Sequence, residues 1–288
     1  MPSKRGVQKL VDGSADQTDD ESDGKGSSYA AIIAEIFRRK YRKGDDEVRF
    51  ERDEIERAAI SLGIQKPKNL GDVVYSFRYR KRLPASILRT EPRDRSWLIL
   101  GDGDAKYRFR LARLAQIKPT AGLLIRKIPD ATPEIIAQYA LKDEQALLAK
   151  VRYNRLIDIF LGITTYSLQN HLRTKVANYG QIEIDELYVG VDTHGAHYVV
   201  PVQAKSGKDI LGVIQTIQDA VYCASEPHYA NCICRPVSAQ FLDKETIALF
   251  ETTFDGDEVS IKQEKHYRLT AASDISQDEL KRYRQDGD

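Results

Sequence analysis

The chain has 288 residues, of which 41% are hydrophobic, and its formal net charge is +1. This composition is typical of a folded protein long enough for two domains and excludes a wholly disordered chain. The near-neutral charge gives no overall nucleic-acid footprint, so a prediction of DNA binding depends on where the basic side chains gather.

Membrane and secretory signals are missing from the sequence pattern. No apolar run approaches the roughly 20 residues that span a bilayer, and the N-terminus has no apolar secretory segment. Three cysteines without a C-x-x-C pair indicate neither a disulfide framework nor a zinc site. We therefore expect a cytoplasmic protein that does not enter a membrane.

The first third of the chain predicts three helices and a hairpin. Residues 1–27 are rich in Asp, Ser and Gly, which predicts a disordered tail. Helical spacing of apolar residues predicts a helix from Ser28, followed by a strand over 48–50 and a second helix over 53–62. Asn69 is a suitable N-cap for a third helix over 70–81, and strands over 96–100 and 107–111 form a hairpin.

This order of elements resembles a winged helix-turn-helix, in which a later helix enters the major groove. Residues 28–115 are therefore predicted to form a winged-helix-like DNA-binding domain. Aromatic and cationic side chains alternate at the end of the third helix, and the candidates for phosphate or base contact are Arg78, Arg80, Lys81 and Arg82. The alternative is a small α+β domain whose arginines form a solvated face.

The remainder of the chain mixes helical and strand patterns. Residues 116–145 are expected as a connector, with a short strand over 122–128 and a helix over 132–141. A second domain over 146–272 is predicted to begin with helices over 143–160 and 166–179 and to continue, after a strand hairpin, with a helix over 209–224 and a strand over 232–239. A helix over 246–250, a strand over 259–269 and a charged tail over 273–288 complete the prediction.

The hairpin over 181–205 carries polar residues in otherwise apolar arms. A turn centred on His194 pairs positions whose numbers sum to 388, which places Asp185 opposite Gln203. Lys205 returns to the same face because side chains alternate with period two. A slip of one residue would scatter these three groups, so the register is a testable prediction.

Together these groups predict a metal site. The Asp185 carboxylate, the Gln203 amide oxygen and the Ala204 carbonyl are hard oxygen ligands of the kind that Mg²⁺ prefers, and Lys205 can orient and deprotonate a water molecule. This chemistry suits hydrolysis of a phosphodiester bond. The alternative is a core hairpin with one surface Asp, one Gln and one Lys whose stem lies along apolar surface.

A strand with IEID followed by a strand ending in VQAK resembles the PD-(D/E)XK nuclease superfamily. The resemblance implies an α/β (α+β) fold with a mixed sheet flanked by helices, and catalytic roles for Asp185, Gln203 and Lys205. Gln203 stands where Glu or Asp is usual, which resembles the Mrr-like branch with its Q-x-K motif. A preceding helix often brings a further acidic residue in this fold. Gln169 is the candidate at that place here, and Arg173 is a candidate for phosphate contact.

The leading prediction is an endonuclease that cuts duplex DNA with Mg²⁺, or Mn²⁺ in its place, in restriction or another form of defence. A homodimer is expected if both strands are cut, because one site cuts one strand. The first alternative is a DNA-binding regulator whose metal site is impaired by the missing carboxylate at Gln203. The second is a scaffold without affinity for DNA.

Overall fold

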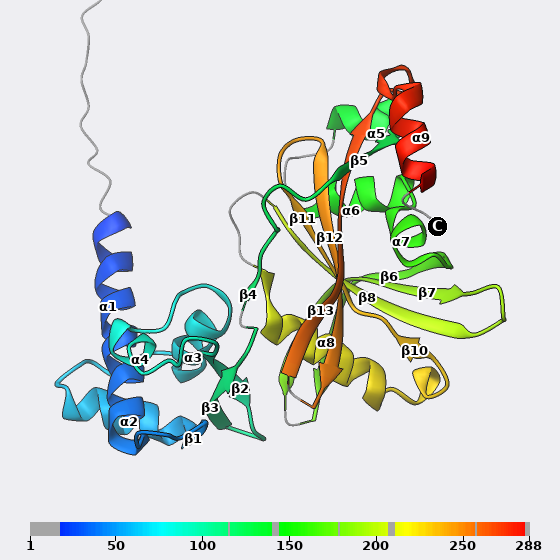
Figure 1. Cartoon of the computed structure of the whole chain (residues 1–288). Coiled ribbons are helices and arrows are strands. Elements are labelled where there is room, and N and C mark those ends of the chain that lie inside the picture. Colours follow the sequence, from blue (N-terminus) through cyan, green and yellow to red (C-terminus); the bar gives the residue numbers. More distant parts are fainter. Residues whose placement is uncertain are drawn as a thin grey trace, which may run out of the picture.

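The computed structural model of the chain describes residues 18–114, 116–139, 144–177, 179–206, 211–256 and 258–285, with side chains from residue 26 onward. Figure 1 shows a smaller N-terminal unit, coloured blue to cyan, beside a larger C-terminal unit, coloured green to red. In these ranges, no helix combines the length and apolar character required to cross a membrane.

The N-terminal unit has the predicted order of elements with one addition, the short helix α4 (Ala85–Leu88) between the third helix and the hairpin. Its three strands form an antiparallel sheet in the order β1-β3-β2, and Asn69 caps the third helix by accepting a hydrogen bond from the Gly71 N–H at 3.0 Å. Its elements are α1 (Thr18–Lys40), β1 (Glu47–Glu51), α2 (Arg52–Ser61), α3 (Leu70–Tyr79), α4 (Ala85–Leu88), β2 (Ser96–Gly101) and β3 (Lys106–Ala112).

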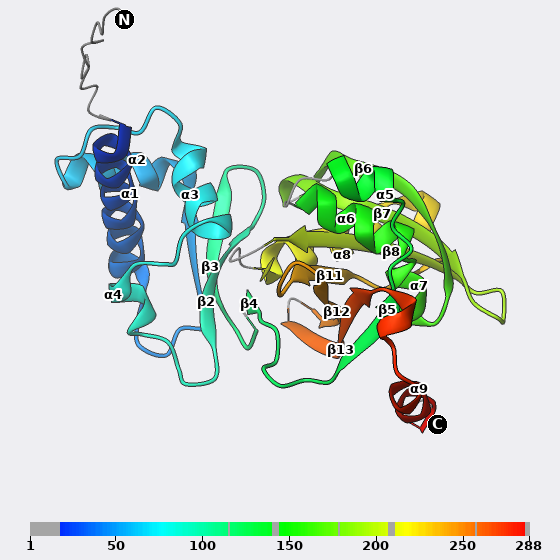
Figure 2. The same ribbon diagram turned by 90° about the horizontal axis from the view of Figure 1, so that it is seen from above.

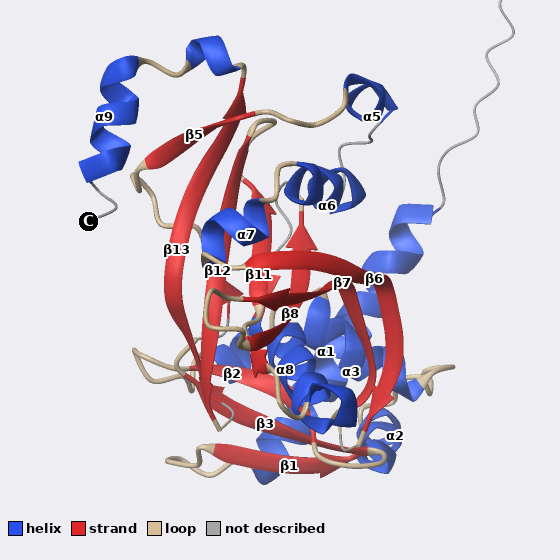
Figure 3. Cartoon of the chain, turned by 90° about the vertical axis from the view of Figure 1, so that its right-hand side faces the viewer, coloured by secondary structure: helices blue, strands red, loops and turns tan. Residues whose placement is uncertain are grey.

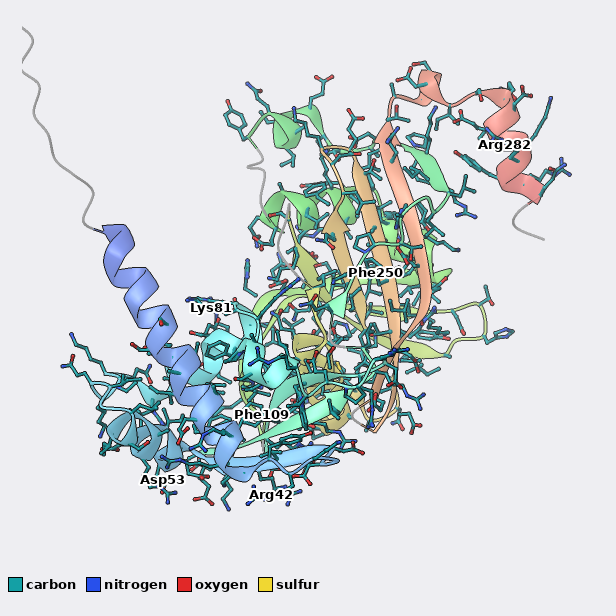
Figure 4. All side chains as sticks on the ribbon, turned by 60° about the vertical axis from the view of Figure 1, so that its left-hand side comes forward. Arg42, Asp53, Lys81, Phe109, Phe250 and Arg282 are labelled. Carbon is teal, nitrogen blue, oxygen red and sulfur yellow. The ribbon has the colours of Figure 1, made fainter. Side chains whose placement is uncertain are left out.

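An aromatic group fills the core of this unit. The Phe37 ring meets Trp97 and Phe109 edge-on at centroid distances of 5.1 Å, and Phe50 lies 5.0 Å from Phe109. Edge-to-face rings stabilise a core beyond the apolar area that they bury. Phe109, labelled in Figure 4, is fully buried, so the hairpin is fixed against α1.

The two ends of the described chain are helical, which corrects the prediction of a disordered tail up to residue 27. Helix α1 begins at Thr18, whereas a disordered tail was expected up to residue 27; residues 1–17 lie outside the described residues. In the expected charged tail, α9 (Gln277–Gln285) follows a 3₁₀ turn (Ala272–Asp274). Lys127 anchors this helix: its Nζ lies 3.0 Å from Glu279 Oε1, and its main-chain N–H donates a hydrogen bond to the Tyr283 hydroxyl at 3.0 Å.

The C-terminal unit is built on an eight-stranded mixed sheet. Its elements are β4 (Gln116–Ile117), β5 (Ile125–Pro129), α5 (Glu134–Tyr139), α6 (Glu144–Tyr153), α7 (Leu156–Leu161), β6 (Thr164–Val176), β7 (Gly180–Val191), β8 (His197–Lys205), β9 (Leu211–Gly212), α8 (Val213–Ser225), a 3₁₀ turn (Pro227–Tyr229), β10 (Ile233–Cys234), β11 (Val237–Phe241), β12 (Thr246–Asp255), β13 (Glu258–Thr270) and α9. Figure 3 shows its long strands as red arrows, with β12 beside β13. Strand β5 belongs to this sheet although it lies in the segment expected as a connector.

The strand order in the main path is β5-β13-β12-β11-β8-β7-β6, and β10 also pairs with β8. Strands β6, β7 and β8 form an antiparallel meander, and the chain then passes through α8 to β11, which pairs in parallel with β8. A parallel neighbour needs such a crossover. The parallel strand after a crossover helix, expected over 232–239, is thus confirmed as β10 and β11.

Helices cover both faces of the sheet. In β12, Ile247 and Leu249 pack in the apolar group of α6 and α7, whereas Ala248 and Phe250 pack in the group of α8. This alternation is the period of two that a strand imposes on its side chains. The central strands are consequently apolar on both faces, so a polar residue within them is conspicuous.

Two predicted helices are strands, and a third is broken. Of the helix expected over 166–179, residues 166–176 lie in β6, where Leu168 is 53% exposed and so does not belong to an inner helical stripe. Thr246–Phe250 lies in β12, which pairs along its length with β13. Pairing with long neighbouring strands outweighs weak local helical spacing. The helix expected over 143–160 divides into α6 and α7 at Arg155, which has a left-handed φ of 48°.

An apolar group joins the two units. Leu98 and Leu100 of β2 pack in one cluster with Ile214 and Ile217 of α8. Beside it, the Tyr79 hydroxyl at the end of α3 donates a hydrogen bond to Gln218 Oε1 at 2.9 Å. Figure 2 shows the resulting arrangement, in which the hairpin of β2 and β3 faces the C-terminal unit.

Candidate active site

The β7–β8 hairpin has the predicted register. Its ladder pairs run from Glu186 with Val202 to Val191 with His197, and each pair of numbers sums to 388. Asp185 and Gln203 come next beyond this ladder. At that point side chains link the strands: Asp185 Oδ2 accepts the Ala204 N–H at 2.8 Å, and Gln203 Nε2 donates to the Glu183 carbonyl at 2.9 Å.

Gln203 points toward α8 and away from solvent. It is 2% exposed, and its Nε2 donates to both carboxylate oxygens of Asp219, at 3.1 and 2.9 Å. Its Oε1 accepts a hydrogen bond from Gln215 Nε2 at 3.2 Å. The amide nitrogen is therefore fixed on Asp219, which turns the amide oxygen toward Gln215.

Asp219 is an acidic group that the sequence reasoning missed. It is 1% exposed on the inner face of α8, and burial raises the pKa of its carboxyl well above the usual range. The hydrogen bonds from Gln203 oppose this rise, and the charge of Asp185 adds to it. The signal was in the sequence, because position 219 lies at helical spacing from the buried Thr216 and Cys223.

Asp185 and Lys205 lie within electrostatic reach of each other. Burial raises the pKa of the Asp185 carboxyl, and the negative charges of Glu183 and Glu144 add to the rise. The Ala204 N–H and the positive charge of Lys205 act in the opposite direction. Because charged groups influence one another only over short distances in water, these effects show that the acidic and basic groups gather at this end of the hairpin.

A helical acid does approach the site, but from another place than predicted. Glu144, the first residue of α6, has Oε1 3.7 Å from Lys205 Nζ. Gln169, predicted for this role on a helix, lies exposed on β6 opposite Leu187, and the structure gives it no hydrogen bond to Asp185. Acidic residues are common in the first turn of a helix because they interact favourably with the helix dipole. The position of Glu144 in the sequence therefore does not indicate a role in the site.

Arg173 is paired across the sheet. Its Nη2 lies 3.0 Å from Glu183 Oε1, on the neighbouring strand β7, and its side chain is 66% exposed. The predicted phosphate contact therefore competes with an exposed ion pair, which contributes little energy and can be exchanged.

A cleft of about 1510 Å³ lies between the two units; Lys205 and Glu144 line it, whereas Asp185, Gln203 and Asp219 lie behind its wall. Ten of its lining residues are lysine or arginine and four are aspartate or glutamate, so the cleft is basic although the chain is nearly neutral. Figure 4 labels Lys81 on the side of the N-terminal unit that faces the cleft. The lining residues include four of the five predicted DNA contacts and three charged residues near the site: Arg78, Arg80, Lys81, Arg82, Glu144, Glu183 and Lys205.

The donor atoms fit a hard cation only with help from neutral oxygens and water. Across the described ranges, no three His, Cys, Asp or Glu side chains are grouped to hold a metal ion. An ionised carboxylate has about four acceptor positions, so Asp185 keeps capacity beside its bond to Ala204. The Gln203 amide oxygen, which accepts a hydrogen bond from Gln215, and the main-chain carbonyls are neutral oxygens of the kind that Mg²⁺ accepts alongside water.

Comparison of the chain with protein-family models, with curated proteins and with solved structures found no match. The site is therefore interpreted from its own geometry.

Proposed function

We propose that the protein is a Mg²⁺-dependent endonuclease that cuts duplex DNA in restriction or another form of defence. Its C-terminal unit would be a PD-(D/E)XK-like, restriction-endonuclease-like catalytic domain, and its N-terminal unit a winged-helix-like DNA-binding domain. The observation that carries the proposal is the β7–β8 hairpin: its ladder runs as far as Glu186 with Val202, and just beyond it Asp185 accepts the N–H of Ala204, which lies between Gln203 and Lys205. The order α6, α7, β6, β7, β8, α8 and β11 supports it.

The residues of the site have distinct roles. Asp185, the Gln203 amide oxygen and the Ala204 carbonyl would hold Mg²⁺, with Mn²⁺ as a substitute, and the bound ion would stabilise negative charge on a phosphate oxygen. The Lys205 ammonium, which lies 3.7 Å from Glu144, would orient the attacking water. After releasing one proton to solvent, the neutral Lys205 amine would take the proton of that water. The water oxygen bonds to phosphorus, the bond from phosphorus to one sugar oxygen breaks, and that oxygen gains a proton.

DNA binding in this proposal depends on the basic cleft. The end of α3 and the loop after it carry Arg78, Arg80, Lys81 and Arg82 on the same cleft as Lys205, so the bound segment and the cut phosphate are close together. Arg173 would exchange its exposed partner Glu183 for a phosphate oxygen. Cutting of both strands requires two sites, so we propose a homodimer acting in the cytoplasm.

The test is plasmid cleavage with matched lysine variants. Wild-type protein and Lys281→Ala, an exposed change on α9, are expected to nick or linearise plasmid DNA in the presence of Mg²⁺. Lys205→Ala is expected to cut about 10²- to 10⁴-fold more slowly, because a positioned acid or base contributes about that factor. Binding of plasmid by Lys205→Ala should persist. Cutting by Lys205→Ala at the wild-type rate would refute the proposal.

A DNA-binding regulator is the second candidate, and one observation favours it. Gln203 is 2% exposed and holds Asp219, so its amide oxygen is less available to a metal than a carboxylate would be. Retained DNA binding without cutting by the wild-type protein, in Mg²⁺ and in Mn²⁺, would establish the regulator. A protein that fails to retard duplex DNA even at low salt would exclude both candidates.

A further inference from the structure

The wall of the cleft formed by α3 carries a stacked group of aromatic and cationic side chains, which we call the α3 stack: Tyr75, Arg78, Tyr79 and Arg80. The rings of Tyr75 and Tyr79 lie 4.8 Å apart, and the Arg80 guanidinium lies 4.9 Å from the Tyr75 ring. The hydrogen bond from Tyr79 to Gln218 fixes this stack against the C-terminal unit. Tyr75 remains 47% exposed, so an aromatic surface is presented to the cleft.

Arg78 adds a cation to the stack. Its guanidinium lies 5.1 Å from the Tyr79 ring, and its buried Nε and Nη2 have no hydrogen-bond partner among the described residues. Leaving buried charged donors unsatisfied is costly, and a phosphate oxygen is a strong acceptor for them. The α3 stack therefore combines a surface for a base with an unused donor for the adjacent phosphate.

The lining of the cleft suits an unpaired strand. Ten of its lining residues are lysine or arginine, and the Tyr75 side chain, which also lines it, is 47% exposed. In a paired duplex the bases stack on one another, whereas an unpaired base offers a free face to an aromatic side chain.

We propose that the cleft binds an unpaired stretch of a nucleic-acid strand, with one base stacked on Tyr75 and a neighbouring phosphate on Arg78. The inference rests on the proposed function and deepens it: the duplex opens locally, and the strand that leaves the α3 stack continues toward Lys205. A basic groove with exposed aromatic rings is the arrangement that binds single strands without strong sequence preference.

The test is fluorescence anisotropy in EDTA, so that binding is measured without cutting. The probes are a labelled 12-nucleotide single strand of mixed sequence, the same strand fully paired, and a duplex with four unpaired nucleotides in its middle, each made as DNA and as RNA. The wild-type protein should bind the single strand and the opened duplex at least tenfold more tightly than the paired probe. Whichever of DNA and RNA is preferred among the unpaired probes supports the inference and identifies the substrate.

Tyrosine variants locate the stacking surface. Tyr75→Ala should weaken binding of the unpaired probes about 5- to 150-fold, the range for loss of one stacked base. Tyr75→Phe should retain affinity, and so should Tyr139→Ala, whose side chain is 72% exposed on α5 and does not line the cleft. In wild-type protein, 2-aminopurine in the single strand should be quenched on binding, which reports stacking without a substitution.

Equal affinity for paired and unpaired probes would overturn the inference, as would binding by Tyr75→Ala within twofold of wild type. The two proposals fail separately. A protein that prefers unpaired strands but cuts nothing refutes the nuclease and leaves the strand-binding cleft, whereas a nuclease that binds paired duplex best refutes only the cleft.

Discussion

The contact between Gln203 and Asp219 predicts that a more acidic site is a less stable one. In Gln203→Glu, the two amide donations to Asp219 and the donation to the Glu183 carbonyl are lost, and two buried carboxylates face each other about 3 Å apart. An uncompensated buried charge costs about 3–5 kcal/mol, so we expect the free energy of unfolding to fall by about that amount.

A second substitution separates charge repulsion from loss of packing. In Gln203→Glu with Asp219→Asn, the amide and the carboxylate exchange places and a hydrogen bond between them is restored. The Glu183 carbonyl still lacks its donor, so we expect a remaining loss of about 1–2 kcal/mol. Urea denaturation at pH 8 measures all three proteins. Gln181→Glu, an exposed change at the start of β7, is the control and should alter stability by less than about 0.5 kcal/mol.

Two results would refute this reasoning. One is a Gln203→Glu protein as stable as wild type, which would mean that the amide does not need to donate to Asp219. The other is a double variant no more stable than Gln203→Glu, which would mean that the two side chains are not energetically coupled.

Three further substitutions test other parts of the fold. Arg152→Ala removes the Nε that lies 2.7 Å from the fully buried Glu186, so the free energy of unfolding measured in urea should fall by about 3–5 kcal/mol. In Arg57→Ala, which breaks an exposed ion pair within a helix, it should fall by less than about 1 kcal/mol. Burial raises the pKa of the Glu251 carboxyl, but hydrogen bonds from three side chains outweigh it and lower the pKa to about 2 from 4.5. Because the folded-state pKa is below the unfolded one, this carboxylate stabilises the fold above pH 4.5 and stops doing so as the pH falls to about 2. The loss of stability across that window, followed by circular dichroism, should be smaller by about 2–3 kcal/mol in Glu251→Gln. Asn69→Ala removes the α3 cap and should cost about 1 kcal/mol in the same urea assay.

Each of these expectations has a contrary outcome. Equal losses in the two arginine variants would show that burial of Glu186 does not matter. An acid response of Glu251→Gln identical to that of wild type would show that its ion pairs persist in the unfolded chain. A stable Asn69→Ala protein would show that packing alone maintains α3.

The sequence predicted the hairpins and the N-terminal helices because their signals are local. A turn at His194 with alternating apolar residues on each side determines the register of β7 and β8, and Asn69 begins α3 where a cap was expected. The assignment of β6 failed because Leu168, Leu172 and Val176 repeat every fourth residue, and only pairing with β7 decides their conformation.

The candidate site was predicted in part. Asp185 and Lys205 followed from the register, but Glu144 and Asp219 come from helices whose position against the sheet is set by tertiary packing. Spacing along the chain does not predict that the side chain of Asp219 will contact that of Gln203. The role of Gln203 therefore became visible only with its buried partner.

The apolar cluster between the units bears on how this chain could be divided. Leu98 and Leu100 share an apolar cluster with residues of α8 and β12, so separating the two units would expose apolar surface on both fragments. The N-terminal unit is therefore not a module that can be transferred unchanged to another protein, and a substitution on one side of this interface must be accommodated by the other side.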